Sequence, residues 1–226
     1  MPSHYGPPIV NKNLVVWHDP IDTNCYGGSG TTVNNLAGIP TMTCNGDSPS
    51  HSYSNPGFFT YNGSNQQITL PASDFPGHEL NSKSTISAWI NFSGSGQCSF
   101  AGTMSSWDNG FKYWGALNNF FYRTGDGTNR SNILNGYNTG LSNNVWNNIV
   151  MVRNGQDWLF YTNGTLKTTV SVASIGNTNA SHIFRIGSVN NWFFNGKIGQ
   201  VLCYQDALTS NQVIHNYEIL RHRYGV

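Results

Sequence analysis

The stretch VWNNIVMVRNGQDWLFYTNGTLKTTVSV, from Val145 to Val172, decides the fold. It contains three runs rich in β-branched and aromatic residues, and these runs are separated by Asn154-Gly155 and Asn163-Gly164. Asn-Gly is the strongest short hairpin signal, because both central residues of a type I′ turn need positive φ. The stretch therefore predicts a three-stranded antiparallel meander with two tight turns.

Strand patterns continue on both sides of this meander. STISAWINF, Ser84 to Phe92, alternates so that Ile86 and its i+2 neighbours form one face, while the other face carries Thr85, Ser87, Trp89 and Asn91. Further strands are predicted at LVVWHD, at HIFRIGS and in the run that ends at Tyr204. Short strands with turn signals between them are typical of a β-sandwich, and in it we expect Trp89 and Trp146 to be structural.

The chain finishes on a helix. Thr209 can cap its first turn, and Gln212 three residues later completes a capping box. Apolar residues then follow at helical spacing, which predicts one buried stripe; they are Val213, Ile214, Tyr217 and Leu220. Gly225 lies just beyond the last turn.

Composition limits the classes of function. Only 9% of the 226 residues are charged, against roughly 25% in an average soluble domain, and the net charge is +1. Basic residues cluster only at Arg221, His222 and Arg223, so we expect no nucleic-acid binding. No stretch has the length of a membrane span and the first residues carry no secretion signal, so we expect no membrane insertion.

The four cysteines are Cys25, Cys44, Cys98 and Cys203. They lack the Cys-x-x-Cys spacing typical of zinc sites. Three disulfide pairings stay open from the sequence, and we expect free, buried thiols instead.

Four segments together resemble the concanavalin A-like lectin/glucanase superfamily, in particular its laminin-G-like and pentraxin-like jelly rolls. They are LVVWHD with the following YGGSGTTVNNLAG, STISAWINF, WNNIVMVRNGQDWLFYTNG, and IGSVNNWFFNGKIGQVLCYQDALTSNQVIHNY. The resemblance implies an all-β antiparallel jelly-roll sandwich over residues 13–226, with a short C-terminal helix. It also implies that the closing strand returns beside the first, so that the helix covers a sheet edge or corner.

A narrower resemblance is to laminin-G-like proteins of tailed bacteriophages, carried by HYGPPIV, LVVWHD and NYEILRHRYG. It implies a virion structural protein, a capsid decoration or a tail or fibre component, located in the virion and assembled in the host cytoplasm. Its partners would be other virion proteins, copies of itself and cell-surface polysaccharide. Residues 1–12 would form an extended arm that attaches to the particle, with Tyr5, Pro7, Pro8 and Ile9 as contact residues. A stand-alone carbohydrate-binding lectin is the alternative.

Catalysis is not expected, because glycoside hydrolysis needs two carboxylates flanking the scissile bond. The only glutamates are Glu79, in a predicted loop, and Glu218, on the terminal helix. The superfamily resemblance makes Ca²⁺ the one cofactor to consider, with Asp108 and Asp126 as ligands, although Asx-turns explain both residues equally well.

Glycan binding in such folds uses aromatic rings and amides at loop tips. The residues of this kind are Trp107, Trp114, Asn119, Asn190, Asn191 and Trp192. Core or interface packing is the alternative role for these tryptophans.

Overall fold

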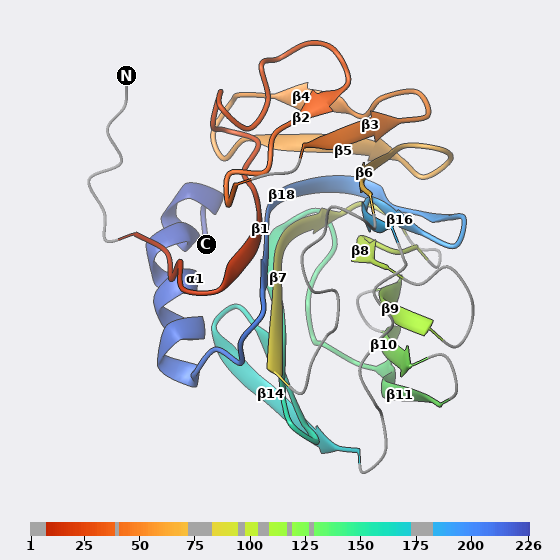
Figure 1. The fold of residues 1–226 in the computed structure, drawn as a ribbon, viewed down its shortest axis with the longest axis vertical. Helices are drawn as coiled ribbons and strands as arrows, with labels where there is room; N and C mark the ends of the chain where they lie inside the picture. Colours follow the sequence, from red (N-terminus) through yellow and green to blue (C-terminus); the bar gives the residue numbers. More distant parts are fainter. Residues whose placement is uncertain are drawn as a thin grey trace.

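The computed structural model describes residues 8–38, 41–71, 83–94, 98–103, 109–116, 119–126, 129–172 and 183–226. They form two eight-stranded antiparallel sheets, a small hairpin and one helix, which confirms the all-β jelly-roll sandwich (Figure 1). In the described part of the chain, no helix combines the length and apolar character that a membrane crossing requires.

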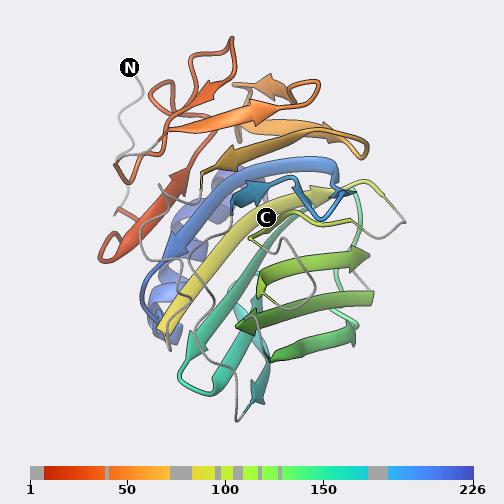
Figure 2. The ribbon, with the colours of Figure 1, turned by 45° about the vertical axis from the view of Figure 1, so that its right-hand side comes forward.

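The first sheet, called sheet A, has the order β14-β13-β12-β7-β18-β5-β4, with β1 also paired to β18. Its strands are β1 (Leu14–His18), β4 (Ser50–Ser52), β5 (Phe58–Asn62), β7 (Lys83–Phe92), β12 (Trp146–Asn154), β13 (Asp157–Thr162), β14 (Thr165–Ser171) and β18 (Asn195–Tyr204). The long strands β7 and β18 run side by side through its middle (Figure 2). The pairing of β1 with β18 confirms that the closing strand returns beside the first.

The second sheet, sheet B, has the order β11-β10-β9-β8-β15-β6-β3-β2. Its strands are β2 (Thr32–Val33), β3 (Met42–Asn45), β6 (Gln67–Leu70), β8 (Ala101–Gly102), β9 (Asn109–Ala116), β10 (Asn119–Asp126), β11 (Arg130–Tyr137) and β15 (Phe184–Ile186). A separate hairpin joins β16 (Ser188–Val189) to β17 (Trp192–Phe193). The main core lies between the sheets and is filled by residues such as Phe59, Ile90 and Ile186.

The meander β12-β13-β14 is confirmed, and one of its two turns differs from the expectation. Asn163 and Gly164 have φ of 48° and 71°, as a type I′ turn requires. In the first turn, Asn154 pairs with Asp157, so the central residues are Gly155 and Gln156. Only Gly155 has positive φ there, which fits a type II′ turn, since that turn needs glycine at its first central position.

Helix α1 (Ser210–Tyr224) covers the outer face of sheet A rather than an edge or corner. Its capping box is confirmed: Thr209 Oγ1 accepts from the Gln212 backbone, and the Gln212 side chain accepts from the backbone N–H of Thr209. Val213 packs against residues of β12, β13 and β18 in a second apolar cluster on this face.

The predicted apolar stripe of the helix is wrong at Ile214, whose exposed fraction is 43%. Asn216 is buried in its place. Its side chain accepts from Val10 N at 2.9 Å and donates to the Tyr204 hydroxyl at 3.0 Å. A polar residue takes the buried position because both of its hydrogen-bonding ends are used.

The last residues of the predicted arm lie on this chain's own helix. Ile9 is buried in the helix–sheet cluster, and the carbonyl of Pro8 accepts from His215 Nε2 at 3.1 Å. The Tyr204 hydroxyl donates to the carbonyl of Val10 at 2.8 Å. Tyr5 and Pro7 lie outside the described residues, so the attachment role of the arm stays a prediction.

Candidate functional site

A row of five residues crosses the outer face of sheet A beside the C-terminal end of α1, and we call it the outer-face row. Its members are directly opposed on adjacent strands β4, β5, β18, β7 and β12; they are Ser50, Thr60, Lys197, Asn91 and Trp146. Directly opposed residues share one face of a sheet. With strands about 4.8 Å apart, five strands span about 19 Å. Ser50 is exposed and the other four are half-buried.

Two aromatic rings meet on this face although their strands are not neighbours. Phe58 begins β5 and Trp146 begins β12, and their ring centroids are 5.9 Å apart. The strands β18 and β7 run between them. The ammonium of Lys197 lies 4.7 Å from the centroid of the Phe58 ring. Phe58, like Trp146, is half-buried, so the two rings form a patch that solvent reaches.

The polar groups of the outer-face row have no partners within the described residues. The Thr60 hydroxyl, the Lys197 ammonium, the Asn91 amide and the Trp146 indole N–H make no hydrogen bond or ion pair there. None of them is among the buried atoms that lack a partner. These groups therefore remain available for a ligand, with aromatic rings beside them.

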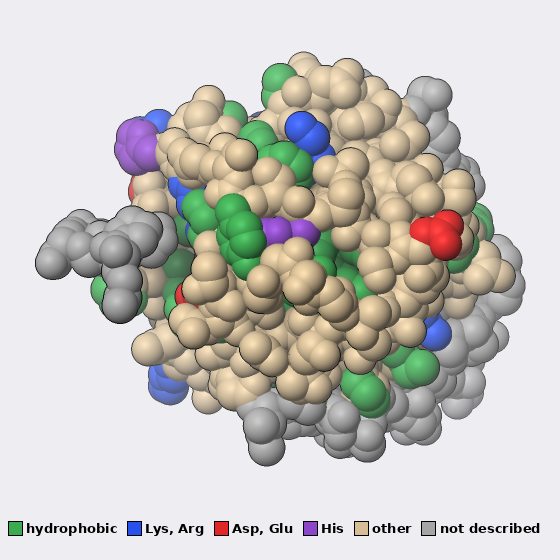
Figure 3. All heavy atoms as spheres, turned by 90° about the horizontal axis from the view of Figure 1, so that it is seen from above, with side chains coloured by type: hydrophobic (Ala, Val, Ile, Leu, Met, Phe, Trp, Pro, Cys, Tyr) green, Lys and Arg blue, Asp and Glu red, His purple; other side chains and the backbone are tan. Residues whose placement is uncertain are grey.

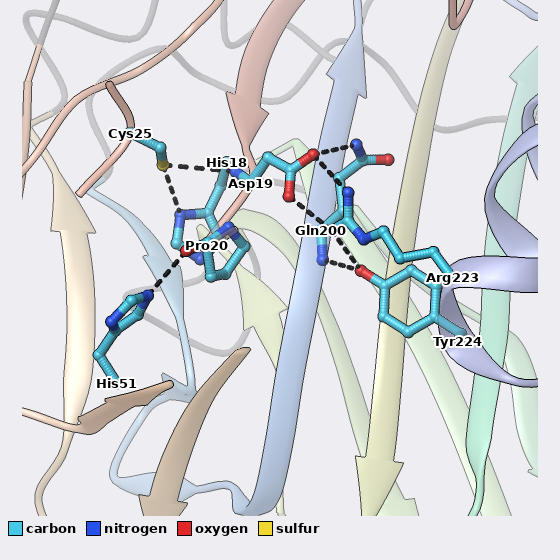
Figure 4. Close-up of polar contacts among 8 residues, drawn as sticks. All are labelled: His18, Asp19, Pro20, Cys25, His51, Gln200, Arg223 and Tyr224. Atoms are coloured by element: carbon cyan, nitrogen blue, oxygen red, sulfur yellow. Dashed lines mark hydrogen bonds and ion pairs between the residues drawn. The ribbon is translucent and has the colours of Figure 1, made fainter. Parts of the chain in front are cut away.

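A cluster of polar side chains that bond one another lies next to the row, and we call it the Asp19 cluster (Figure 4). The Asp19 carboxylate accepts from both terminal nitrogens of Arg223, at 2.9 and 2.5 Å, and from Gln200 Nε2 at 2.9 Å. The Tyr224 hydroxyl accepts from Arg223 and from the backbone N–H of Gln200. Side-chain exposures of 12% for Arg223 and 8% for Asp19 show that this ion pair is largely shielded from water.

The hydrogen bonds of the Asp19 cluster hold the Tyr224 ring next to Trp146, a member of the outer-face row. The Tyr224 ring stacks on Trp89 at 4.1 Å and meets Trp146 edge-on at 4.9 Å. A Cβ at Gly199 would lie 2.4 Å from the Tyr224 hydroxyl, so only glycine leaves room for this ring. The end of the helix thus supports Trp146 from one side.

A cysteine–histidine contact lies beneath the Asp19 cluster. Cys25 Sγ is 3.7 Å from His18 Nδ1, and both residues are fully buried. Burial raises the pKa of the Cys25 thiol to about 12 and lowers the pKa of His18 to about 4. Both groups are therefore neutral at pH 7, whereas an activated nucleophile needs thiolate character. All four cysteines of the chain are free and buried.

Three aromatic residues at the end of the sandwich, Tyr26, His51 and Tyr53, contact one another and hold the glycine-rich loop after Tyr26. Figure 3 looks onto this end and shows hydrophobic side chains and a histidine gathered in a shallow depression. The Tyr53 hydroxyl donates to the carbonyl of Tyr26, and the Tyr26 hydroxyl donates to Gly30 O at 2.9 Å. His51 Nε2 donates to Pro20 O at 2.7 Å. Each of these donors bonds a backbone carbonyl of this chain, so these aromatic residues have a structural role.

The predicted glycan-binding residues that the structure describes do not lie in the outer-face row. Asn190 and Asn191 form the turn of the β16–β17 hairpin, with φ of 53° and 62°, and half-buried Trp192 follows them. Asn119 is exposed at the start of β10, in sheet B. Only the backbone of Trp114 is described, and it pairs with Phe121. Trp107 lies outside the described residues.

The side chains of the predicted calcium ligands, Asp108 and Asp126, are not among those that the structure describes. Asp108 lies outside the described residues, and Asp126 is described only by its backbone, which pairs with Asn109 at the end of β10. Across the residues that the structure describes, no three His, Cys, Asp or Glu side chains gather in a way that could hold a metal ion. Calcium binding stays an untested expectation.

Sequence reasoning missed Lys197 and treated Trp146 as purely structural. The alternation in STISAWINF does place Asn91 outward, and the same alternation in the closing strand turns Lys197 outward. Their adjacency follows only from the register of β7 against β18, which joins residues more than one hundred positions apart. No local signal in the sequence carries that register.

Solved structures of known proteins resemble this chain in fold. Domain 4 of AbnA, an extracellular arabinanase from Geobacillus stearothermophilus solved with arabinotriose, is 17% identical with a TM-score of 0.69, and 91% of this chain and 98% of that chain are covered. A structure of botulinum neurotoxin type C, a toxin whose cell entry depends on interaction with two ganglioside molecules, is 13% identical with a TM-score of 0.71. The match covers 93% of this chain and 52% of the neurotoxin chain, so this chain spans about half of the neurotoxin structure.

No curated protein sequence matches the chain. A family profile does match residues 62–214, more than half of the chain. It covers β6, STISAWINF, the whole meander and the first residues of α1. The chain therefore belongs to the concanavalin A-like lectin/glucanases superfamily, as its laminin-G-like group.

Proposed function

We propose that this chain is a non-enzymatic binding domain that holds an oligosaccharide across the outer-face row. The observation that carries the proposal is the pair of partly exposed rings, Phe58 and Trp146, beside side chains with unused hydrogen-bonding groups. Ligand sites typically combine apolar and aromatic surface with a few polar groups that fix orientation. A sugar presents both counterparts, because its C–H groups can pack on a ring while its hydroxyls reach the amide and the hydroxyl.

The geometry suits an extended ligand. The row runs perpendicular to the strands, and its about 19 Å length offers consecutive contacts to a short chain of sugars. Asn91 and Thr60 supply neutral donors and acceptors on either side of Lys197. Four of the five strands, β5, β18, β7 and β12, are paired on both sides, and β4 lies at the edge of the sheet. The spacing of the row on these four strands is fixed before a ligand arrives, which limits the entropy lost on binding.

The comparisons support a carbohydrate ligand. Among the chain's structural neighbours, the arabinanase domain was solved with arabinotriose and a neurotoxin binding domain with a sialylated ligand. The proposal includes no catalysis, and two of the described carboxylates are already used in ion pairs: Glu218 lies 2.6 Å from Arg221, and Asp19 is paired with Arg223. No metal or other cofactor is part of the proposal.

The test is a screen of the purified chain against immobilised oligosaccharides, followed by calorimetric titration of each hit. Trp146→Ala should weaken binding at least tenfold, since stacking on an aromatic ring is lost. Trp192→Ala is the matched control from the β16–β17 hairpin, and it should leave affinity unchanged. Asn91→Ala is a second variant. It removes an amide and no aromatic ring, and it should also weaken binding. Full affinity in both row variants, or loss only in Trp192→Ala, would contradict the site.

We also propose that the domain serves in a virion, as a capsid decoration or as part of a tail or fibre. This proposal rests on the resemblance of HYGPPIV, LVVWHD and NYEILRHRYG to bacteriophage proteins and on the low fraction of charged residues, 9%. Interfaces between proteins are depleted in charge, so the composition suits assembly with other virion proteins or with copies of itself.

Immunogold electron microscopy on the native source material tests the virion role. Regular labelling of virus-sized particles is expected. Deletion of residues 1–7, which leaves Pro8, Ile9 and Val10 on the helix, should abolish attachment while the domain still folds. Label confined to cells or secreted matrix would contradict the virion role and would leave a stand-alone lectin.

A further inference from the structure

The outer-face row carries one charge, and that charge is uncompensated. Lys197 makes no ion pair or hydrogen bond within the described residues, while its neighbours in the row, Thr60 and Asn91, are neutral. Charged residues are few in this chain, with 10 acidic and 11 basic residues. The Lys197 ammonium is therefore the charge that a ligand on this face of the sheet would meet. It gives the row a positive centre.

The ammonium is also held in place. Its position 4.7 Å from the Phe58 ring centroid is within the range of a cation–π interaction. A free lysine has a flexible four-carbon stem and loses rotamer entropy when it binds. Because the ring restrains Lys197 before a ligand arrives, less of that entropy is lost on binding.

The carboxylates near the end of the helix do not oppose an anion at this position. The Glu218 carboxylate accepts from Arg221 at 2.6 Å, and the Asp19 carboxylate accepts from Arg223 and Gln200. His222 adds an exposed imidazole to the last helical turn. Both of these carboxylates are compensated by arginines, and Lys197 has no ion pair with a described residue.

We infer that the outer-face row selects acidic oligosaccharides, and that Lys197 binds a carboxylate of the sugar while Trp146 and Phe58 pack against the ring. The inference rests on the proposed function. A charge-assisted hydrogen bond is about twice as strong as a neutral one, so the charged ligand gains where a neutral sugar of the same shape does not. Sulfated sugars share the negative charge but lack the planar carboxylate.

The experiment compares acidic sugars with their uncharged methyl esters. Trigalacturonate and sialyllactose are each titrated beside their methyl esters, at low salt and at about 0.5 M NaCl, where the Debye length falls to a few ångströms. The wild-type chain should bind at least one acidic member about tenfold more tightly than its neutral partner, and salt should reduce that ratio. Lys197→Gln should bring the two affinities together, whereas Trp146→Ala should weaken both.

The outcomes separate the two proposals. Equal affinity for acidic and neutral members in the wild type would overturn the selection of acids and leave glycan binding intact. A preference that survives in Lys197→Gln would also overturn it, because another group would then bind the anion. Tighter binding of sulfated lactose than of sialyllactose would replace the carboxylate by a sulfate ligand. Failure of every oligosaccharide to bind would overturn both proposals.

Discussion

The Asp19 cluster and the outer-face row lie side by side and share Tyr224 as a neighbour, yet their polar groups are used in opposite ways. In the Asp19 cluster, each charged or polar side chain bonds another, and water is largely excluded. In the row, the hydrogen-bonding groups are half-exposed and unpaired within the described residues. Among the described atoms of the cluster, Gln200 Oε1 and Arg223 Nε are buried without a partner, but every one of its side chains bonds another. Side chains that bond one another identify a structural element, and unpaired, half-exposed groups beside aromatic rings identify a surface for recognition.

The difference also has a cause in the fold. The Asp19 cluster joins the end of β1, the middle of β18 and the last turn of α1, three segments that must stay together for the sandwich to close. The row belongs to strands that are already held together by backbone hydrogen bonds. Its side chains are therefore not needed to keep these strands in place. Four predictions test this comparison, and they are given from the largest effect to the smallest.

Asp19→Ala should lower the free energy of unfolding by about 3 kcal/mol, because it leaves the guanidinium of Arg223 shielded and unpaired. Glu218→Ala is the matched control, since the Glu218–Arg221 pair is exposed, and its loss should cost less than about 1 kcal/mol. Urea unfolding followed by circular dichroism measures both. Equal costs would mean that the Asp19 cluster does not differ from a surface ion pair.

His18 should make stability depend on pH. Its pKa is lowered from 6.5 to about 4, mainly by burial and against the attraction of Asp19. The unfolded chain therefore binds a proton below pH 6.5 that the folded chain refuses until about pH 4, so stability falls as the pH drops through this window. Between pH 7 and 5 the wild type should lose about 2 kcal/mol more than His18→Gln. Parallel losses in urea unfolding would contradict this assignment.

Gly199→Ala should disturb both regions at once. The added Cβ would lie 2.4 Å from the Tyr224 hydroxyl, so the ring must shift away from Trp146, at a cost of roughly 1 to 2 kcal/mol. Gly27→Ala is the control, because a Cβ there has no neighbour within 4 Å and its φ is not positive. Thermal unfolding and glycan titration measure the two effects. An unchanged affinity in a destabilised Gly199→Ala would show that Tyr224 does not support the row.

Lys197→Gln and Asn91→Ala should change stability least, by less than about 1 kcal/mol each. Neither side chain makes a hydrogen bond or ion pair with a described residue, and Lys197 loses only its contact with the Phe58 ring. The same urea titrations apply. A loss of 1 kcal/mol or more in Asn91→Ala would indicate a structural role and would place the row with the Asp19 cluster.

Much of the fold follows from local signals in the sequence. The meander and the capping box are set by residues within a few positions of each other, and both are confirmed. The buried position of Asn216 and the exposure of Ile214 were not predicted, because they depend on Val10 and Tyr204, which lie far away in the sequence. Helical periodicity alone cannot show which polar side chain finds buried partners.

The candidate site was less predictable than the fold. Sequence reasoning placed the aromatic platform at loop tips around Trp192, whereas the structure gathers partly exposed rings and unpaired polar groups on a sheet face. Asn91 and Lys197 become neighbours only when β7 pairs with β18, and Phe58 meets Trp146 only across those two strands. Such contacts come from sheet order, which the alternation of single strands does not encode.

The most direct test is a titration of the ¹⁵N-labelled chain with the oligosaccharides found in the binding screen, following the tryptophan indole N–H resonances. Each resonance is assigned from the spectrum of a Trp→Ala variant. The resonance of Trp146 should shift with ligand concentration and saturate, while that of Trp192 stays in place. Saturable shifts confined to Trp192, with Trp146 unmoved, would show that the ligand binds at the hairpin and not at the outer-face row.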